Sequence, residues 1–217
     1  ALTMIGASML WVGWFGFNGG SALGAGGGAG MALLVTHIAA ATASLVWMGI
    51  EWMRFGRPSL VGIVTGMVAG LATVTPASGF IGVPGGLILG LAGGFGCYIA
   101  VDIIRGKLKI DDSLDVFAVH GVGGIIGSLL LAFLALPGSG GLGLADGVTP
   151  GSQFMVQLAS VAITVAWTLV VSVIILMIAK AVAGLRVDDQ TEVDGLDLAE
   201  HGAVSYTHLR AHETPCH

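Results

Sequence analysis

Long apolar runs recur along this chain, and most of them are long enough to cross a membrane. A membrane-spanning helix needs about 20 consecutive apolar residues. Only 10% of the 217 residues are charged and the mean hydropathy is +0.93, whereas a soluble domain carries about 25% charged residues. These features predict an all-α, polytopic helical membrane protein with six transmembrane helices. The runs cover about residues 2–23, 31–53, 60–75, 85–104, 114–136 and 154–183.

Glycine is unusually frequent, with 37 residues, and in a membrane it allows helices to approach closely. Gly123 and Gly127 form a small-xxx-small pair that predicts such a contact. The glycine-rich segment 24–30 has no lysine and no Gly-Lys-Ser/Thr ending, so we expect a flexible loop rather than a phosphate loop. The run 60–75 is short for a full crossing, and it leads into the turn-rich connection 75–86.

Lysine and arginine predict the orientation of the helices. Seven lysine and arginine residues lie between the second and third apolar runs, between the fourth and fifth runs, or near the C-terminal end. With six helices these positions all lie on one side of the membrane, and the other connections contain none. The positive-inside rule therefore predicts that this side, with the C-terminus, is cytoplasmic. The seven are Arg54, Arg57, Arg105, Lys107, Lys109, Lys180 and Arg186.

We predict three regions: a transmembrane domain over 1–183, a cytoplasmic tail over 184–205, and a segment over 206–217 that resembles a translated sequencing adapter. Because Ala1 already lies in an apolar segment with no basic region before it, we expect no signal peptide and interpret the chain as the C-terminal part of a longer protein. The last run is about 30 residues, or about 45 Å at 1.5 Å per residue, so it should tilt or project.

Cysteine and charge exclude several classes of function. Cys97 lies in an apolar run and Cys216 in the adapter-like segment, so we expect no disulfide framework, no metal site and no cofactor. The chain has no basic patch, so nucleic acid is not an expected partner. The histidines and the cysteine of the last segment could imitate a metal site, but we exclude them with the segment: His208, His212, His217 and Cys216.

His120 is the one titratable side chain inside the fifth apolar run. An ionisable group within a membrane helix is by default a functional-site hypothesis. A neutral imidazole can accept from and donate to a small polar substrate, so we interpret His120 as a pore or proton-handling group. The alternative is a histidine that ties two helices together. Helical spacing places Val116, Phe117, Gly124 and Gly127 on its face.

Other candidates each have two interpretations. Trp14 and Phe17 share a helical face with Ser21 one turn further, and this set could hold a cation at the outer mouth or belong to an ordinary aromatic belt. His37 is surrounded by small residues, which favours a structural histidine. For Asp115, at the start of the His120 helix, capping is the preferred interpretation.

Several motifs resemble the ammonium transporter (Amt/Mep/Rh) family, in its bacterial Amt branch, and the similarity runs to about residue 205. Two carry most of the resemblance: GWFGFNGGS at Gly13–Ser21 and DDSLDVFAVHGVGGIIG at Asp111–Gly127. Three others add to it: Glu51–Ser59, Val74–Gly82 and Gly195–Gly202.

The resemblance implies specific roles. Members of the family have eleven spans and form homotrimers with one pore per subunit, so the six runs would be spans six to eleven. His120 would be the second histidine of the pore pair, Phe17 one of two gate phenylalanines, and Ser21 the hydroxyl of the external cation site. Trp14, Thr75 and Val116 would line the path. The other histidine and gate phenylalanine would belong to the first five spans.

The implied activity is transport of ammonium/ammonia rather than catalysis. Ammonium would lose its proton at the outer site, and neutral ammonia would cross the apolar pore, which avoids the cost of placing a bare cation there. The lipid membrane and, at the cytoplasmic face, a PII signalling protein are the other implied partners. Ala203 stands where the family usually has an acidic tail residue. The alternative function is an ammonium sensor that signals through its tail, but the short tail favours transport.

Overall fold

The computed structural model describes residues 2–200, apart from the side chains of Asp197 and Leu198, and it is helical with no strand in that range. This confirms the predicted all-helical fold. The predicted adapter-like segment and its histidines lie outside the described residues. Six long helices correspond to the six apolar runs: α1 (Leu2–Gly20), α2 (Gly27–Phe55), α3 (Leu60–Val74), α4 (Val83–Val101), α5 (Val122–Leu134) and α6 (Pro150–Val182).

Shorter elements extend these helices or follow them. The π-helical segment η1 (Asp102–Lys107) continues α4, and the π-helical segment η2 (Val116–Gly121) precedes α5. By length and composition, four helical segments within residues 2–200 are suited to cross a membrane: 27–55, 83–107, 116–134 and 150–182. α3 has 15 residues and is shorter, as its sequence predicted. The remaining elements are η3 (Pro137–Ser139), α7 (Asp189–Asp194) and α8 (Leu196–Ala199).

The chain divides into two compact units, one ending at Ile163 and the other beginning at Thr164. The first unit holds the bundle of α1 to α5. The second contains α7, which begins where the Asp188 carboxylate accepts hydrogen bonds from the backbone N–H and the hydroxyl of Thr191, at 2.9 and 3.0 Å. These bonds favour the ionised carboxylate and hold the pKa of Asp188 below its usual range.

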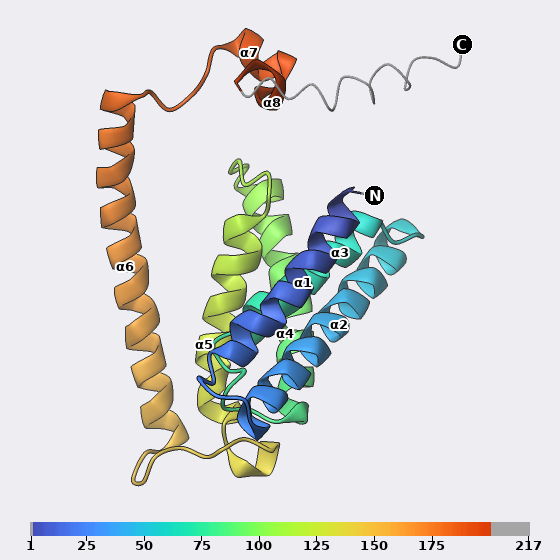
Figure 1. Cartoon of the computed structure of the whole chain (residues 1–217), viewed down its shortest axis with the longest axis vertical. Coiled ribbons are helices and arrows are strands. Elements are labelled where there is room, and N and C mark those ends of the chain that lie inside the picture. The colour runs from blue at the N-terminus through green and yellow to red at the C-terminus, as the bar shows by residue number, and fades with distance from the viewer. Residues whose placement is uncertain (1, 201–217) are drawn as a thin grey trace. The chain divides into compact units, whose positions relative to one another are not determined.

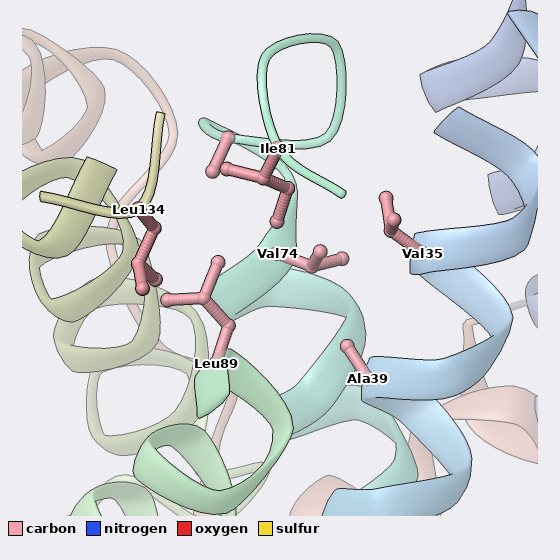
Figure 2. Close-up of a cluster of buried hydrophobic side chains, with 7 residues drawn as sticks. Val35, Ala39, Val74, Ile81, Leu89 and Leu134 are labelled. Carbon is pink, nitrogen blue, oxygen red and sulfur yellow. The ribbon is translucent and has the colours of Figure 1, made fainter. Parts of the chain in front are cut away.

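Small residues bring α2, α3 and α4 together. A Cβ atom on Gly70 of α3 would overlap the backbone of Ala39 in α2, and one on Gly90 of α4 would lie 2.8 Å from the Ala39 carbonyl oxygen. Because lipid is as apolar as these side chains, close van der Waals packing stabilises such contacts. The buried cluster between these helices is shown in Figure 2 and comprises Val35, Ala39, Val74, Ala77, Ile81, Leu89 and Leu134.

The predicted close contact at Gly123 and Gly127 is confirmed. A Cβ atom on Gly127 would overlap the Thr73 carbonyl group, and one on Gly123 would lie 2.9 Å from Thr73 Oγ1. The two glycines therefore let α5 lie directly against α3.

Connections within the first unit gather at its two ends (Figure 1). The connections between α2 and α3 and between α4 and η2 lie at one end of the bundle, near the start of α1. The connections between α1 and α2, between α3 and α4, and after α5 lie at the other end. The basic residues Arg54, Arg57, Arg105, Lys107 and Lys109 thus belong to a single end.

The glycine-rich segment differs from the prediction. We expected a flexible loop over 24–30, but α2 begins at Gly27, and the N–H of Gly30 bonds to the carbonyl of Gly26. Glycine costs a helix about 1 kcal/mol per residue relative to alanine. The contacts that Ala29 and Leu33 of α2 make with Gly19 of α1 help to offset this cost.

Candidate functional site

Trp14 of α1 contacts three of the predicted site residues. Its indole Nε1–H donates a 2.8 Å hydrogen bond to Thr75 Oγ1, just after α3. Its ring stacks on that of His120, with centroids 6.2 Å apart and planes 20° apart. Phe17 meets the indole edge-on at 6.0 Å and 71°. Trp14 and His120 are 106 positions apart in the sequence, and they meet at one indole ring together with Phe17 and Thr75.

The Thr75 hydroxyl holds that indole in place through a second bond. Thr75 Oγ1 donates to the carbonyl of Leu71 at 2.7 Å and so presents a lone pair to Trp14. A buried polar N–H needs such a partner because an unmade hydrogen bond there costs about 1–3 kcal/mol. Trp14 thus has a defined orientation toward His120.

Ser21 lies one turn beyond Phe17, at the C-terminal end of the Trp14–Phe17 face of α1. Its hydroxyl donates to the Phe17 carbonyl at 2.7 Å, which leaves its oxygen lone pairs available to a donor such as a cation. Phe17 is 62% exposed. Ser21 also lines a pocket of about 350 Å³, together with Asn18, Ala22, Gly28, Ala32, Thr75, Pro76, Ser78, Gly79 and Phe80.

His120 lies in η2 on its exposed side. Ala118 and Val119 are buried, whereas Val116 is 55% and Phe117 59% exposed. The N–H of Val122 bonds to the Phe117 carbonyl five residues back, as in a π-helix. Such π-turns are frequent at functional sites.

The predicted face of His120 needs one correction. At ordinary helical spacing Gly127 would share this face, but Gly127 packs against Thr73 on the α3 side. The physical reason is the wider turn of η2, which shifts the register between His120 and α5. Gly124, by contrast, has open space around it, as expected for the face of His120.

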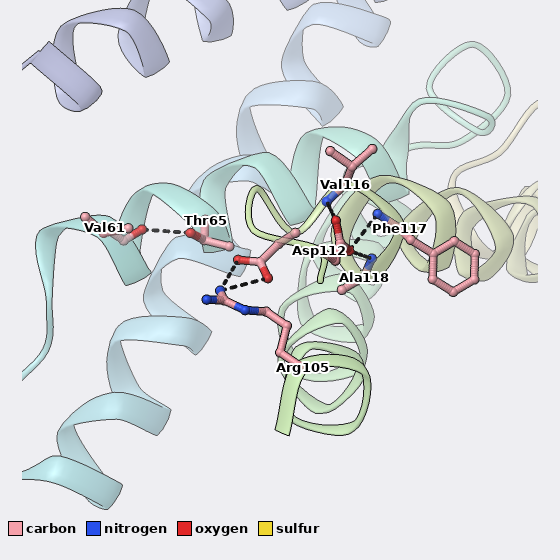
Figure 3. Close-up of polar contacts among 8 residues, drawn as sticks. Val61, Thr65, Arg105, Asp112, Val116, Phe117 and Ala118 are labelled. Atoms are coloured by element: carbon pink, nitrogen blue, oxygen red, sulfur yellow. Dashed lines mark hydrogen bonds and ion pairs between the residues drawn. The ribbon is translucent and has the colours of Figure 1, made fainter. Parts of the chain in front are cut away.

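The predicted capping role of Asp115 is wrong. Asp115 occupies the N-cap position of η2 with a left-handed backbone (φ 54°), but its side chain makes no capping bond. Its carboxylate instead pairs with Arg105 at 3.2 Å. Asp112 is the cap, as Figure 3 shows, because its carboxylate accepts from three backbone N–H groups: those of Val116, Phe117 and Ala118.

His37 takes part in a separate group. Its ring lies 5.2 Å from that of Trp11 and 6.0 Å from that of Phe15, both on α1. These ring contacts join α2 to α1, which agrees with a structural histidine. The indole Nε1 of Trp11 is buried and has no hydrogen-bond partner within the described chain.

Sequence reasoning missed a buried polar pair between α1 and α2. Asn18 is 3% exposed, and its Nδ2 donates to Thr36 Oγ1 at 2.9 Å, while that hydroxyl donates to the Ala32 carbonyl at 2.6 Å. An asparagine and a threonine inside two apolar runs are the available signal, since polar side chains in membrane helices pair across helices.

Two arginines at the basic end form ion pairs, Arg54 with Asp102 and Arg105 with Asp115. Arg54 donates to the Asp102 carboxylate at 2.5 Å and to the Tyr98 hydroxyl at 3.1 Å. Glu51 accepts from the backbone N–H of Ser59 at 2.6 Å. Among residues 2–200, His, Cys, Asp and Glu form no group of three or more that could hold a metal ion.

Six residues form what we call the His120 strip: Trp14, Phe17, Ser21, Thr75, Val116 and His120. The glycine-mediated bundle of apolar helices that holds this strip defines a polytopic helical membrane protein. The sequence model that describes the Ammonium Transporter Family matches residues 1–206 of this chain. The chain therefore belongs to the ammonium transporter family, as its motifs predicted.

Individual relatives agree with this assignment. The chain is 49% identical over 208 residues to ammonium transporter Amt1 of Archaeoglobus fulgidus, which covers 95% of this chain and 52% of that protein. A solved structure described as a sensor Amt protein has a TM-score of 0.82 at 34% identity and covers 91% of this chain and 48% of its own. Mep2 of Saccharomyces cerevisiae has a TM-score of 0.73 at 36% identity and covers 83% and 44%. The chain thus spans about half the length of these relatives.

Proposed function

We propose that the chain is the C-terminal half of a transporter that moves ammonium/ammonia through a hydrophobic, histidine-containing pore. The observation that carries this proposal is the arrangement around Trp14, which meets His120, Phe17 and Thr75 on one strip. Membership of the ammonium transporter family supports the same substrate.

The strip has the chemistry that this passage needs. At its outer end, the Ser21 oxygen and the faces of Phe17 and Trp14 would attract an ammonium ion through lone pairs and ring quadrupoles. Further in, the passage offers the His120 imidazole and apolar walls such as Val116. A neutral molecule crosses such a wall at far lower cost than an ion, so the proton must leave before ammonia passes.

The exposure of two side chains of the strip supports the proposal that further spans cover it in the parent protein. Phe17 and Val116 are 62% and 55% exposed, although they lie beside the proposed path. In the parent protein, the first five spans would cover these side chains and supply the second histidine and the second gate phenylalanine.

Uptake of labelled methylammonium by proteoliposomes that contain the parent protein tests transport. We expect saturable uptake that unlabelled ammonium inhibits and that potassium does not. Empty liposomes are the control. Uptake equal to that of empty liposomes would rule out the proposed activity.

The assembly and placement follow from the same proposal. We propose a homotrimer in the inner or plasma membrane, with 1–183 embedded, 184–205 as a cytoplasmic tail and 206–217 outside the functional protein. The basic residues at one end of the bundle support this orientation. A PII protein is the proposed partner at the cytoplasmic face, and a pull-down without binding under any nucleotide condition would exclude it.

An ammonium sensor is the second candidate, supported by the similarity to the sensor Amt structure. A sensor would need its tail to signal, whereas a transporter needs its pore. Removing residues 184–217 should leave uptake measurable if transport is the function. If the parent binds ammonium without transporting it, sensing is the better explanation.

A further inference from the structure

The inner end of η2 is held by one carboxylate. Asp112 accepts hydrogen bonds from the backbone N–H groups of Val116, Phe117 and Ala118 at 2.7, 3.0 and 3.1 Å (Figure 3). Bonds to an ionised acceptor are roughly twice as strong as neutral ones. These three bonds satisfy amides that the start of a helix would otherwise leave unpaired.

An ion pair fixes the turn between this cap and η2. Asp115 adopts a left-handed backbone, which is unfavourable for a residue with a side chain. Its carboxylate meets two contacts from Arg105 Nη1, at 3.2 and 3.3 Å, while its carbonyl accepts from the N–H of Val119 at 2.8 Å. The Arg105 pair therefore supports the turn that carries the chain from Asp112 into η2.

The far side of η2 is anchored by packing. Val119 is buried beside Ala69 of α3 and Cys97 of α4, and Ala118 is buried beside Ala100 and Ile104. The Cys97 thiol also donates to the Val119 carbonyl at 3.5 Å. His120 is the next residue, so the direction of its side chain depends on where η2 starts and on how it is anchored.

We propose that Asp112 is a positioning residue for His120, which fixes the start of the π-helical segment and so directs the imidazole toward Trp14. Arg105 and Asp115 act with it by holding the turn. The consequence for transport rests on the proposed function, but the effect on the His120 ring does not.

Histidine NMR of the parent protein tests the positioning directly. With ¹³Cε1-labelled histidine, the His120 signal is assigned by its loss in His120→Gln. Because the imidazole stacks on Trp14, its chemical shift reports that ring contact. We expect Asp112→Asn to shift the His120 signal while that of His37, which contacts other rings, stays in place.

Asp111→Asn is the matched control. Asp111 is the residue before Asp112 and its side chain is exposed, so the variant removes the same charge at a neighbouring position. It should leave the His120 signal unchanged. If Asp112→Asn and Asp111→Asn give the same His120 signal, the positioning role is wrong.

A charge exchange provides a second test that does not alter Asp112. Arg105→Asp and Asp115→Arg should each displace the His120 signal, and the double variant should restore it by re-forming the pair. Displacement that the double variant fails to reverse would overturn the role of the ion pair.

Methylammonium uptake measures the functional consequence. Misplacing a group by about 1 Å can cost up to a hundredfold in rate, so we expect Asp112→Asn to lower the maximal uptake rate about tenfold. The half-saturation concentration should stay constant because Ser21 and Phe17 are untouched. Unchanged uptake alongside a displaced His120 signal would contradict only the transport consequence, and a wild-type parent without uptake would contradict only the proposed function.

Discussion

Thr75 determines where the indole of Trp14 lies, because its hydroxyl is the acceptor for the indole N–H and is itself bonded to Leu71. In an apolar setting the indole N–H has no competing water partner. The position of the Trp14 ring beside His120 therefore depends on this hydroxyl.

Thr75→Val should disturb this group. It removes the acceptor while keeping the shape, and the unpaired N–H costs about 1–3 kcal/mol. We expect a lower melting temperature of the parent protein and slower methylammonium uptake. Thr75→Ser retains the hydroxyl and should behave nearly as wild type. Equal melting temperatures for the valine and serine variants would show that the bond contributes nothing.

Sequence alone predicted part of the site. The spacing of Trp14, Phe17 and Ser21 along one helix was sufficient to group them. The bond from Trp14 to Thr75 joins residues 61 positions apart and depends on how α1 packs against α3, which periodicity does not encode. The choice between Asp112 and Asp115 as the cap depends on a left-handed turn, and either carboxylate is chemically suitable for a cap.

At the scale of elements, glycines determine which helices touch. Gly127 and Gly123 bring α5 against Thr73, and Gly70 brings α3 against α2. The small-xxx-small pattern made the α5 contact predictable. The π-helical segments were not predictable in this way, because neither of their sequences carries a pattern that separates a π-turn from an α-helical turn.

Gly127→Ala and Gly124→Ala form a matched pair that tests this packing. A methyl group on Gly127 would overlap the Thr73 carbonyl, whereas one on Gly124 meets no atom within 4 Å in this chain. Overpacking costs about 1–3 kcal/mol, so thermal unfolding of the purified parent should begin at a lower temperature only in Gly127→Ala. If both variants unfold alike, the contact between α3 and α5 is less close than described.

At the scale of the whole molecule, the grouping of basic connections at one end predicts the topology. Cysteines introduced at Gly138 and at Arg57, both exposed, lie on connections at opposite ends of the first unit. A membrane-impermeant maleimide added to intact cells should label Gly138→Cys and should label Arg57→Cys only after permeabilisation. The reverse pattern would place the basic end outside.

The central claim, that the His120 strip lines the path of ammonium, is tested most directly by methylammonium uptake with the parent protein carrying His120→Asp. In the parent protein, where the first five spans would cover His120, loss of its hydrogen-bonding imidazole costs about 1–3 kcal/mol, which corresponds to a change of roughly 5- to 150-fold in rate. We expect a change of that size together with weaker discrimination against potassium, because a carboxylate holds cations. His37→Asp, in the separate ring group, is the control and should retain potassium discrimination. Unchanged uptake and selectivity in His120→Asp would contradict the account.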